Sequence, residues 1–396
     1  MRIGIYGGTF NPPHRGHVHA AQAAQRALQL DKLLIVPDNT PPHKVLPAGS
    51  PSNAQRLEMV RLAFDGAPGC EVSEIELQRE GPSYSVDTVR QVRELYPDAE
   101  LWLLMGSDML EILPAWRHPR LIMEMAQIAV FARGDAGEQE MFDSMLPRLK
   151  ANFGATVQQI PLEPLQASSS GIRASLAAGK TDLLAEPVLG YILREQLYGT
   201  RTDLKHLSPE ALRPIALSYL RHKRIAHVLG TEQEAAALAG RYGVDVTAAR
   251  IGALLHDCTK KLDMEAQLAL CETYGIALDD MERHTPKLLH AKTGAALARD
   301  VFGVSDAVYE AIRWHTTGKA DMTPLEKVLY LADYIEPTRN FPGVDALRAA
   351  VYRDLDEGLA LGLEMTVQKM ARDGEKVHEK TLEALRFLKG SSTYGT

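Results

Sequence analysis

The sequence has few cysteines and no long apolar run. Of its 396 residues only Cys70, Cys258 and Cys271 are cysteine, and no two of them form a C-x-x-C pair. This scarcity disfavours disulfides and a cysteine-ligated zinc site, and it is typical of a reducing compartment, so we expect a cytoplasmic protein. The N-terminus shows no signal-peptide core and no apolar stretch reaches membrane-spanning length, so we expect no membrane partner.

Positive charge is also scarce. Lysine and arginine number 44 against 51 aspartates and glutamates, which gives a net charge of -7. This balance argues against nonspecific binding to nucleic acid or to an anionic membrane, although it does not exclude local basic pockets. Repeats and low-complexity segments are absent as well. The hydrophobic fraction of 45% is ordinary for a globular protein, and the length predicts two domains, or three.

The stretch MRIGIYGGTFNPPHRGHVHAAQAA organises the first half of the chain. Residues 1–6 alternate and predict a buried strand, and the glycines that follow let the backbone turn close to a ligand. His14 and His17 come next, at the start of an alanine-rich helix, where free N–H groups and the helix dipole attract phosphate. The two imidazoles could simply cap this helix. We favour a pair that hydrogen-bonds a transferring phosphoryl group.

Strand and helix patterns alternate through the first half. A strand, a helix and a second strand within about forty residues imply a right-handed parallel crossover. Helices are predicted over 53–64 and 188–197, and a further helix is predicted to begin within residues 167–173. The further strands are predicted over residues 33–36, 70–77, 101–105, 127–132 and 156–161.

Polar residues follow several of these strands, where open α/β sheets bind ligands. Lys44 lies in a proline-rich loop beyond the second strand, and Gly106 and Asp108 end the fourth. Arg173 lies in the first turn of a serine-capped helix, where its charge opposes the helix dipole, so an anion is expected there. By composition alone Trp116 would be a core residue.

The motif G-G-T-F-N-P-P-H-R-G-H resembles the signature of nucleotidyltransferases of the nicotinate mononucleotide adenylyltransferase family. The resemblance implies a parallel-sheet, Rossmann-like nucleotidyltransferase domain over residues 1–202. It implies transfer of AMP from ATP, carried with Mg²⁺, to nicotinate mononucleotide, with release of pyrophosphate. His14, His17 and Arg173 are implied as catalytic residues. The superfamily also contains phosphopantetheine adenylyltransferase, so another phosphate acceptor is the alternative.

The same resemblance implies a set of substrate contacts. The P-P-H-K loop would lie at the mononucleotide, the S-Y-S segment at the pyridine carboxylate, and Trp116 against the nicotinate ring. Ser85 replaces the threonine of the family's S-Y-T segment. The implied substrate-binding residues are Gly8, Thr9, Phe10, Lys44, Tyr84, Ser85, Thr88, Gly106, Asp108, Trp116, Arg133, Ser169 and Ser170.

The pattern changes after residue 198. No convincing strand follows, so an all-α domain is predicted over residues 203–396. Its apolar helical segments contain histidines and aspartates, which are costly there without partners. One such residue would be a satisfied core group, but six on successive helices indicate shared cations. They are His227, His256, Asp257, His290, His315 and Asp333.

Two imidazole–carboxylate sets could bind two divalent metals with Asp257 between them, an arrangement that suits phosphate chemistry. Histidine-rich ligation with carboxylates and without thiolates fits iron, manganese or zinc better than calcium. Of these three metals, iron is our first expectation and manganese or zinc the alternatives.

The segments G-A-L-L-H-D-C-T-K-K, W-H-T-T-G and L-A-D-Y-I-E-P-T-R resemble HD-domain metal-dependent phosphohydrolases. More narrowly, they resemble the bacterial family that cleaves diadenosine tetraphosphate symmetrically to two ADP. The resemblance implies Lys260 as a catalytic residue and Arg339 as a phosphate contact. It implies one metal at His227, His256, Asp257 and Asp333, and a second at Asp257, His290 and His315.

Alternatives remain at this point. The helical domain could be a nucleotide sensor without hydrolytic activity, although the full ligand set counts against it. His222, His284 and His378 match no ligand position. The sequence leaves a homo-oligomer and communication between the sites open.

Overall fold

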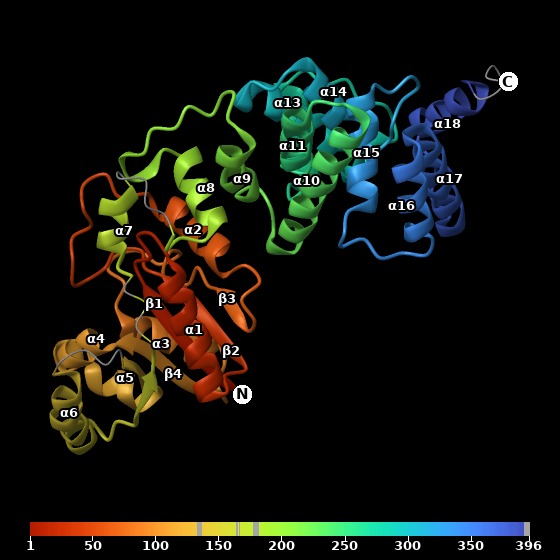
Figure 1. Cartoon of the computed structure of the whole chain (residues 1–396). Helices are drawn as coiled ribbons and strands as arrows, with labels where there is room; N and C mark the ends of the chain where they lie inside the picture. Colours follow the sequence, from red (N-terminus) through yellow and green to blue (C-terminus); the bar gives the residue numbers. More distant parts are fainter. Residues whose placement is uncertain (133–136, 164, 166, 177–181, 392–396) are drawn as a thin grey trace. The chain divides into compact units, whose positions relative to one another are not determined.

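The computed structural model describes residues 1–132, 137–163, 165, 167–176 and 182–391 (Figure 1). Contacts within the chain divide it into two compact units, Met1–Arg201 and Thr202–Thr396. Each unit has its own architecture and is described by itself.

The first unit contains a parallel sheet in the order β3-β2-β1-β4-β5-β6, as the alternating pattern predicted. The order reverses direction between β1 and β4, and ligands of such sheets bind at this switch point, beyond the carboxyl ends of the strands. The strands are β1 (Arg2–Gly8), β2 (Lys32–Pro37), β3 (Cys70–Val72), β4 (Glu100–Gly106), β5 (Gln127–Ala132) and β6 (Val157–Pro161).

Helices cover both faces of this sheet because successive strand residues point to opposite sides. Leu101 and Leu103 belong to one apolar cluster, whereas Trp102 and Leu104 belong to the other. The helices are α1 (Arg15–Leu28), α2 (Asn53–Phe64), α3 (Ser85–Leu95), α4 (Ser107–Ile112), α5 (Pro119–Met125), α6 (Glu138–Phe153), α7 (Ser169–Leu176) and α8 (Glu186–Arg194).

Two predicted elements differ from the structure. The strand predicted over 70–77 ends at Val72, because the chain then turns so that Glu76 reaches the hydroxyl of Thr88. The carbonyl of Glu74 accepts from the N–H of Gln78, which is a helical turn. The helix predicted over 188–197 runs instead from Glu186 to Arg194 and is followed by a separate turn.

The second unit is all-α through the residues described, as predicted. Serine, threonine or aspartate side chains cap several of its helices by accepting an N–H three residues on. The helices are α9 (Pro209–Leu217), α10 (His222–Tyr242), α11 (Val246–Leu255), α12 (Met264–Thr273), α13 (Pro286–Phe302), α14 (Asp306–Trp314), α15 (Pro324–Ile335), α16 (Val344–Arg353), α17 (Leu355–Asp373) and α18 (Glu379–Ser391).

The centre of this unit is formed by α10 against α11 and α15, with α14 against α11, α13 and α15 (Figure 1). Their facing residues include Leu254, Ile312 and Leu329, all fully buried. In the described part of either unit, no helix is both long enough and apolar enough to cross a membrane.

Candidate active sites

The turn after β1 is held by a buried ion pair. Arg56 on α2 is fully buried and donates through Nη1 to Oδ1 of Asp38 at 3.0 Å and to the carbonyl of Thr9 at 2.7 Å. The hydroxyl of Thr9 donates to the other oxygen of Asp38 at 2.7 Å. One guanidinium therefore joins the ends of β1 and β2 to the first turns of α2, through charge-assisted hydrogen bonds.

The histidine pair follows this turn. His14 is the N-cap of α1, and its backbone N–H donates to Nδ1 of His17 at 3.1 Å. Because Nδ1 accepts, the proton of a neutral His17 lies on Nε2, which makes that atom a donor. The capping role and the phosphate-binding role are therefore compatible: His14 orients His17, and His17 lines a cleft.

The N-terminus of α7 packs against the same turn. Arg173 donates through Nη1 to the carbonyl of Asn11 at 2.6 Å, across 162 residues of sequence. Ser169 donates through its hydroxyl to the carbonyl of Pro12 at 3.0 Å, and Tyr198 donates to Oδ1 of Asn11 at 2.7 Å. These bonds bring the predicted anion-binding arginine to the cleft that His17 lines.

The cleft has a volume of about 690 Å³. It lies beyond the carboxyl ends of β1 and β4 and has the size of a small-molecule site. Eleven of the residues predicted at the transferase site are in its lining: Gly8, Thr9, Phe10, His17, Lys44, Ser85, Gly106, Asp108, Trp116, Ser169 and Arg173.

Four predicted residues lie outside the lining, namely His14, Tyr84, Thr88 and Ser170, and Arg133 falls outside the described residues. Thr88 is buried and donates to Glu76 at 2.6 Å, and burial raises the pKa of Glu76, which does line the cleft. Tyr84 is the N-cap of α3 and lies under the guanidinium of Arg117. Thr88 and Tyr84 thus shape the wall of the cleft.

Trp116 both packs against the core and lines the cleft. Its ring stacks on that of His43, with centroids 5.6 Å apart and planes at 25°. Within the described residues its Nε1 is buried and has no hydrogen-bond partner. An aromatic face beside an unsatisfied donor suits a flat ring that carries acceptors.

Sequence reasoning missed Arg56, Asp38, Glu76 and His43. Arg56 gave no signal because a buried arginine on an amphipathic helix has the same spacing as a solvated one. His43 was visible in the P-P-H-K loop, but its stacking partner lies in a distant segment.

In the second unit the six predicted metal ligands come together. His227 lies on α10, His256 and Asp257 follow α11, His290 lies on α13, His315 follows α14, and Asp333 lies on α15. All four histidines and Asp257 are buried.

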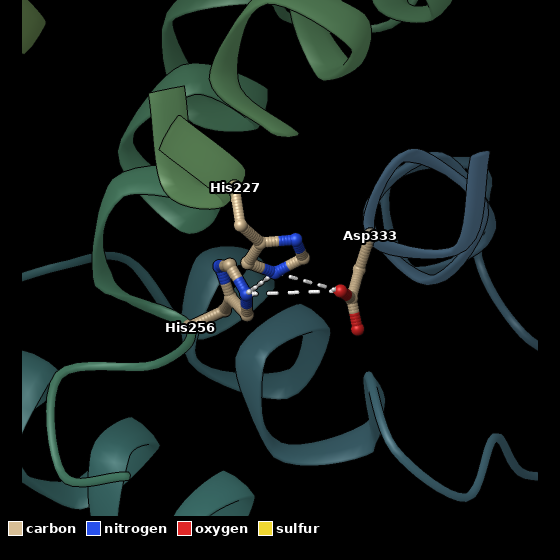
Figure 2. A group of neighbouring side chains, drawn as sticks. All are labelled: His227, His256 and Asp333. Atoms are coloured by element: carbon tan, nitrogen blue, oxygen red, sulfur yellow. Dashed lines mark hydrogen bonds and ion pairs between the residues drawn. The ribbon is translucent and has the colours of Figure 1, made fainter. Parts of the chain in front are cut away.

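Three of these side chains meet at one point (Figure 2). Nε2 of His227 is 3.0 Å from Oδ1 of Asp333 and 3.3 Å from Nε2 of His256. Figure 2 shows that the three side chains come from separate segments and point toward one another.

Asp257 lies between two pairs of histidines. Its Oδ2 is 3.5 Å from Nε2 of His256 and 3.9 Å from Nε2 of His227. Its Oδ1 is 3.2 Å from Nε2 of His290 and 3.9 Å from Nε2 of His315. Each carboxylate oxygen therefore faces its own pair, as in a carboxylate that bridges two cations.

The tautomers of three histidines follow from their other ring nitrogen. Nδ1 of His256 and of His315 donates to a backbone carbonyl, at 2.6 and 2.7 Å, and Nδ1 of His227 lies 3.0 Å from Oε1 of Glu336. With the protons on Nδ1, the Nε2 lone pairs point into the centre. Burial lowers the pKa of His256 and of His315 to about 4, so both are neutral.

This arrangement fits a transition metal. The Nε2 lone pair of His227 faces Nε2 of His256 at 3.3 Å and Oδ1 of Asp333 at 3.0 Å, and Nε2 of His256 lies 4.0 Å from the same oxygen. Acceptors that face acceptors repel unless a cation lies between them. Neutral imidazoles with carboxylates are the donor set that iron, manganese and zinc prefer.

Cationic side chains surround the carboxylates. Arg224 and Lys260 pair with Asp257, and Arg339 pairs with Asp333 at 2.6 Å. Burial acts to raise the pKa of Asp257, but a hydrogen bond from His290 and the Lys260 ammonium outweigh it and hold that pKa well below its usual range. The predicted phosphate contacts Lys260 and Arg339 thus lie at the centre, whereas Arg224 was missed.

A cavity of about 1230 Å³ opens from this centre. Its lining includes residues of this centre and of α17, and the residues of the centre are Lys260, His290, His315, Asp333 and Arg339. The rings of Tyr334 and Phe341, also in its lining, lie 5.3 Å apart at 31°. The cavity therefore combines cations with aromatic faces.

A second cluster, formed by His378, Asp279 and Glu282, has a different character. Nδ1 of His378 accepts the N–H of Lys380, so its Nε2 carries the proton and donates to Asp279 at 3.0 Å. Glu282 pairs with Lys292 at 2.6 Å. The contacts of this cluster are therefore those of a hydrogen-bond and ion-pair network.

Family models match both units. Residues 5–175 match the model described as cytidylyltransferase-like, and residues 224–338 match the HD domain. Fold and sites together define a nucleotidyltransferase domain followed by an HD domain.

Known relatives narrow the class. The probable nicotinate-nucleotide adenylyltransferase of Gloeobacter violaceus is 42% identical over 205 residues, which cover 50% of this chain and 96% of the relative. That of Thermomicrobium roseum is 37% identical over 203 residues, with 50% and 92% covered. Through its first half the chain belongs to the nicotinate-nucleotide adenylyltransferase family.

The second half is similar to a solved structure, that of a predicted HD superfamily hydrolase involved in NAD metabolism from Clostridium acetobutylicum. The two are 39% identical, with 47% of this chain and 98% of that chain covered, at a TM-score of 0.45.

The buried pair gives a stability prediction. Arg56→Met leaves the carboxylate of Asp38 without its cation, so the free energy of unfolding should fall by about 3–5 kcal/mol. Arg90→Met is the control, because Arg90 pairs with Asp87 at the surface, and its loss should cost less than about 1 kcal/mol. Urea denaturation of the full chain measures both, and equal effects would contradict the role given to Arg56.

Proposed function

We propose that the first unit transfers AMP from ATP to nicotinate mononucleotide and releases pyrophosphate. The observation that supports this is a single cleft that joins His17 and Arg173 on one side to Trp116 on another. Membership of the first half in its family supports the acceptor.

The phosphate of the acceptor is already an anion, so the attack on the α-phosphorus of ATP needs no protein base. The chain must align the two phosphates and stabilise the charge that spreads over the transferred group. Nε2–H of His17 and the guanidinium of Arg173 can donate to those oxygens, and His14 holds the ring of His17. Mg²⁺, bound to the triphosphate, would neutralise part of its charge. Lys44 and Arg133 remain predicted phosphate contacts.

The Trp116 side of the cleft would hold the pyridine ring. The N-terminus of α3 at Ser85 lies at the cleft, and backbone N–H groups there suit the carboxylate of nicotinate. An acceptor such as pantetheine phosphate has no flat ring to match the face of Trp116, which disfavours that alternative.

We propose that the second unit hydrolyses diadenosine tetraphosphate symmetrically to two ADP with two divalent metals, of which iron is the first choice. The observation that supports this is Asp257, whose two oxygens face two histidine pairs. His227, His256 and Asp333 would hold one metal and His290 and His315 the other, with Asp257 shared. When bound, such metals activate water and neutralise phosphate charge.

The residues around the centre would bind the rest of the substrate. Lys260 and Arg339 can contact phosphate oxygens, and the rings of Tyr334 and Phe341 offer faces on which a nucleobase can stack. The cavity exceeds the usual size of a small-ligand site, as a ligand with two nucleosides requires. A sensor without hydrolytic activity would not need the complete donor set.

Substrate preference tests the first proposal. If N–H donors near Ser85 bind the pyridine carboxylate, kcat/KM for nicotinate mononucleotide should exceed that for nicotinamide mononucleotide by roughly a hundredfold. The reason is that the neutral amide group offers these N–H donors a poorer acceptor than the carboxylate does. Steady-state kinetics with both acceptors gives the ratio. Equal values would reject this role of the segment.

His17 tests the mechanism. His17→Ala should lower kcat of adenylyl transfer by about 10²–10³ with little change in the Kd of ATP, since its contact strengthens in the transition state. Kinetics and calorimetry separate the two effects. His19→Ala, on the same helix but outside the cleft lining, serves as the control. A pure binding defect would show that His17 has another role.

The number of metals tests the second proposal. His290→Ala or His315→Ala should each remove one of two metals and most hydrolysis of diadenosine tetraphosphate, while adenylyl transfer stays unchanged. Elemental analysis of the purified protein and both assays provide the readout, with His284→Ala as the control. One metal in an active wild-type enzyme, or full hydrolysis in either variant, would contradict the dinuclear proposal.

A further inference from the structure

The four histidines of the metal centre differ in what contacts their outer ring nitrogen. Nδ1 of His256 and Nδ1 of His315 donate to backbone carbonyls, and Nδ1 of His290 is buried with no partner among the described residues. Only His227, of these four, has a carboxylate there, with Oε1 of Glu336 at 3.0 Å from its Nδ1.

Glu336 is itself held firmly. Its side chain is fully buried, and its carboxylate accepts the backbone N–H of Thr338 at 2.6 Å and the hydroxyl of Thr338 at 2.5 Å. Two donors from one residue and the ring of His227 thus satisfy a charge that would otherwise be costly to bury. The orientation of the carboxylate is therefore determined by the turn that follows α15.

Gly230 explains how the carboxylate reaches α10. It lies three residues after His227, so both face the same side of the helix. A Cβ at Gly230 would lie 2.6 Å from Oε2 of Glu336, inside van der Waals contact. Glycine in a helix interior is unfavourable relative to alanine. Here it makes room for the carboxylate beside the ligand.

We propose that Glu336 is the positioning residue of His227, keeping the proton on Nδ1 and directing Nε2 to the metal that His256 and Asp333 share. The inference rests on the proposed metal centre. A carboxylate behind a ligating imidazole raises its basicity and fixes its ring, and losing such a partner typically weakens metal binding about 10- to 100-fold. The two metal positions therefore differ in how their imidazoles are held, since neither His290 nor His315 has a carboxylate at its outer ring nitrogen.

The alternative is that Glu336 only closes the end of α15. A residue with that role would affect the stability of the metal-free protein but not the affinity of one metal position. The test therefore compares metal binding with the melting temperature of the metal-free chain.

The experiment titrates the metal-free full chain with Co²⁺, whose visible spectrum reports the ligand field. Glu336→Gln keeps the size of the side chain but removes its charge. It should weaken one Co²⁺-binding step by roughly 10- to 100-fold and shift the spectrum, while the other step is unchanged. The control is Glu326→Gln, because Glu326 is a buried carboxylate of the same helix that pairs with Lys319 instead. It should bind Co²⁺ as the wild type does.

A second variant keeps the proposal testable if Glu336→Gln does not fold. Gly230→Ala leaves Glu336 intact but pushes its carboxylate away, so the same step should weaken. Wild-type Co²⁺ affinity and spectrum in Glu336→Gln, or in Gly230→Ala if the first variant does not fold, would overturn the inference and leave the metal centre standing. A wild-type chain that binds no Co²⁺ would overturn the metal centre itself, and this inference with it.

Discussion

The helical half depends on one buried carboxylate, that of Asp257. It lies in the turn after α11 with no exposure, and an isolated charge there would be prohibitively costly. Arg224 from α10 and Lys260 from its own turn pair with this carboxylate, and imidazoles from α10, α13 and the end of α14 surround it. Helices that differ widely in sequence position are therefore required to meet at this point. The same convergence produces the donor set of the proposed metal centre.

The first unit also buries a charged side chain, but here the charge is positive. Arg56 is buried, but the carboxylate of Asp38 and the backbone carbonyls of Thr9 and Asp38 accept its N–H groups, so the network is nearly complete without a ligand. At the proposed metal centre, by contrast, the Nε2 lone pairs of His227 and His256 face each other, an arrangement that a cation would satisfy. The Arg56 network therefore supports a neighbouring binding site, whereas the facing lone pairs of the helical unit are themselves the candidate binding site. Glu336 and Thr338 belong to the first kind, because their bonds are satisfied within the protein.

Much of the fold could be predicted because its signals are local. The apolar runs of β2, β4 and β5 and the serine cap of α2 are visible in short windows of sequence, and the structure places these elements within about two residues. The prediction failed for the strand after Cys70, where Ile75 and Leu77 alternate as in a strand. A tertiary hydrogen bond between Thr88 and Glu76 prevails there over the local pattern.

The sequence by itself determined the two architectures, the glycine turn with its histidine pair, and the six polar residues of the proposed metal centre, because each is a matter of residue type and spacing. Only the tertiary structure decided which atoms face each other. It oriented the two oxygens of Asp257 toward different histidine pairs, bound the hydroxyl of Thr88 to Glu76, and brought Glu336 and Gly230 against His227. These relations join residues up to 109 positions apart, and no local pattern encodes them because they arise from the packing of whole helices.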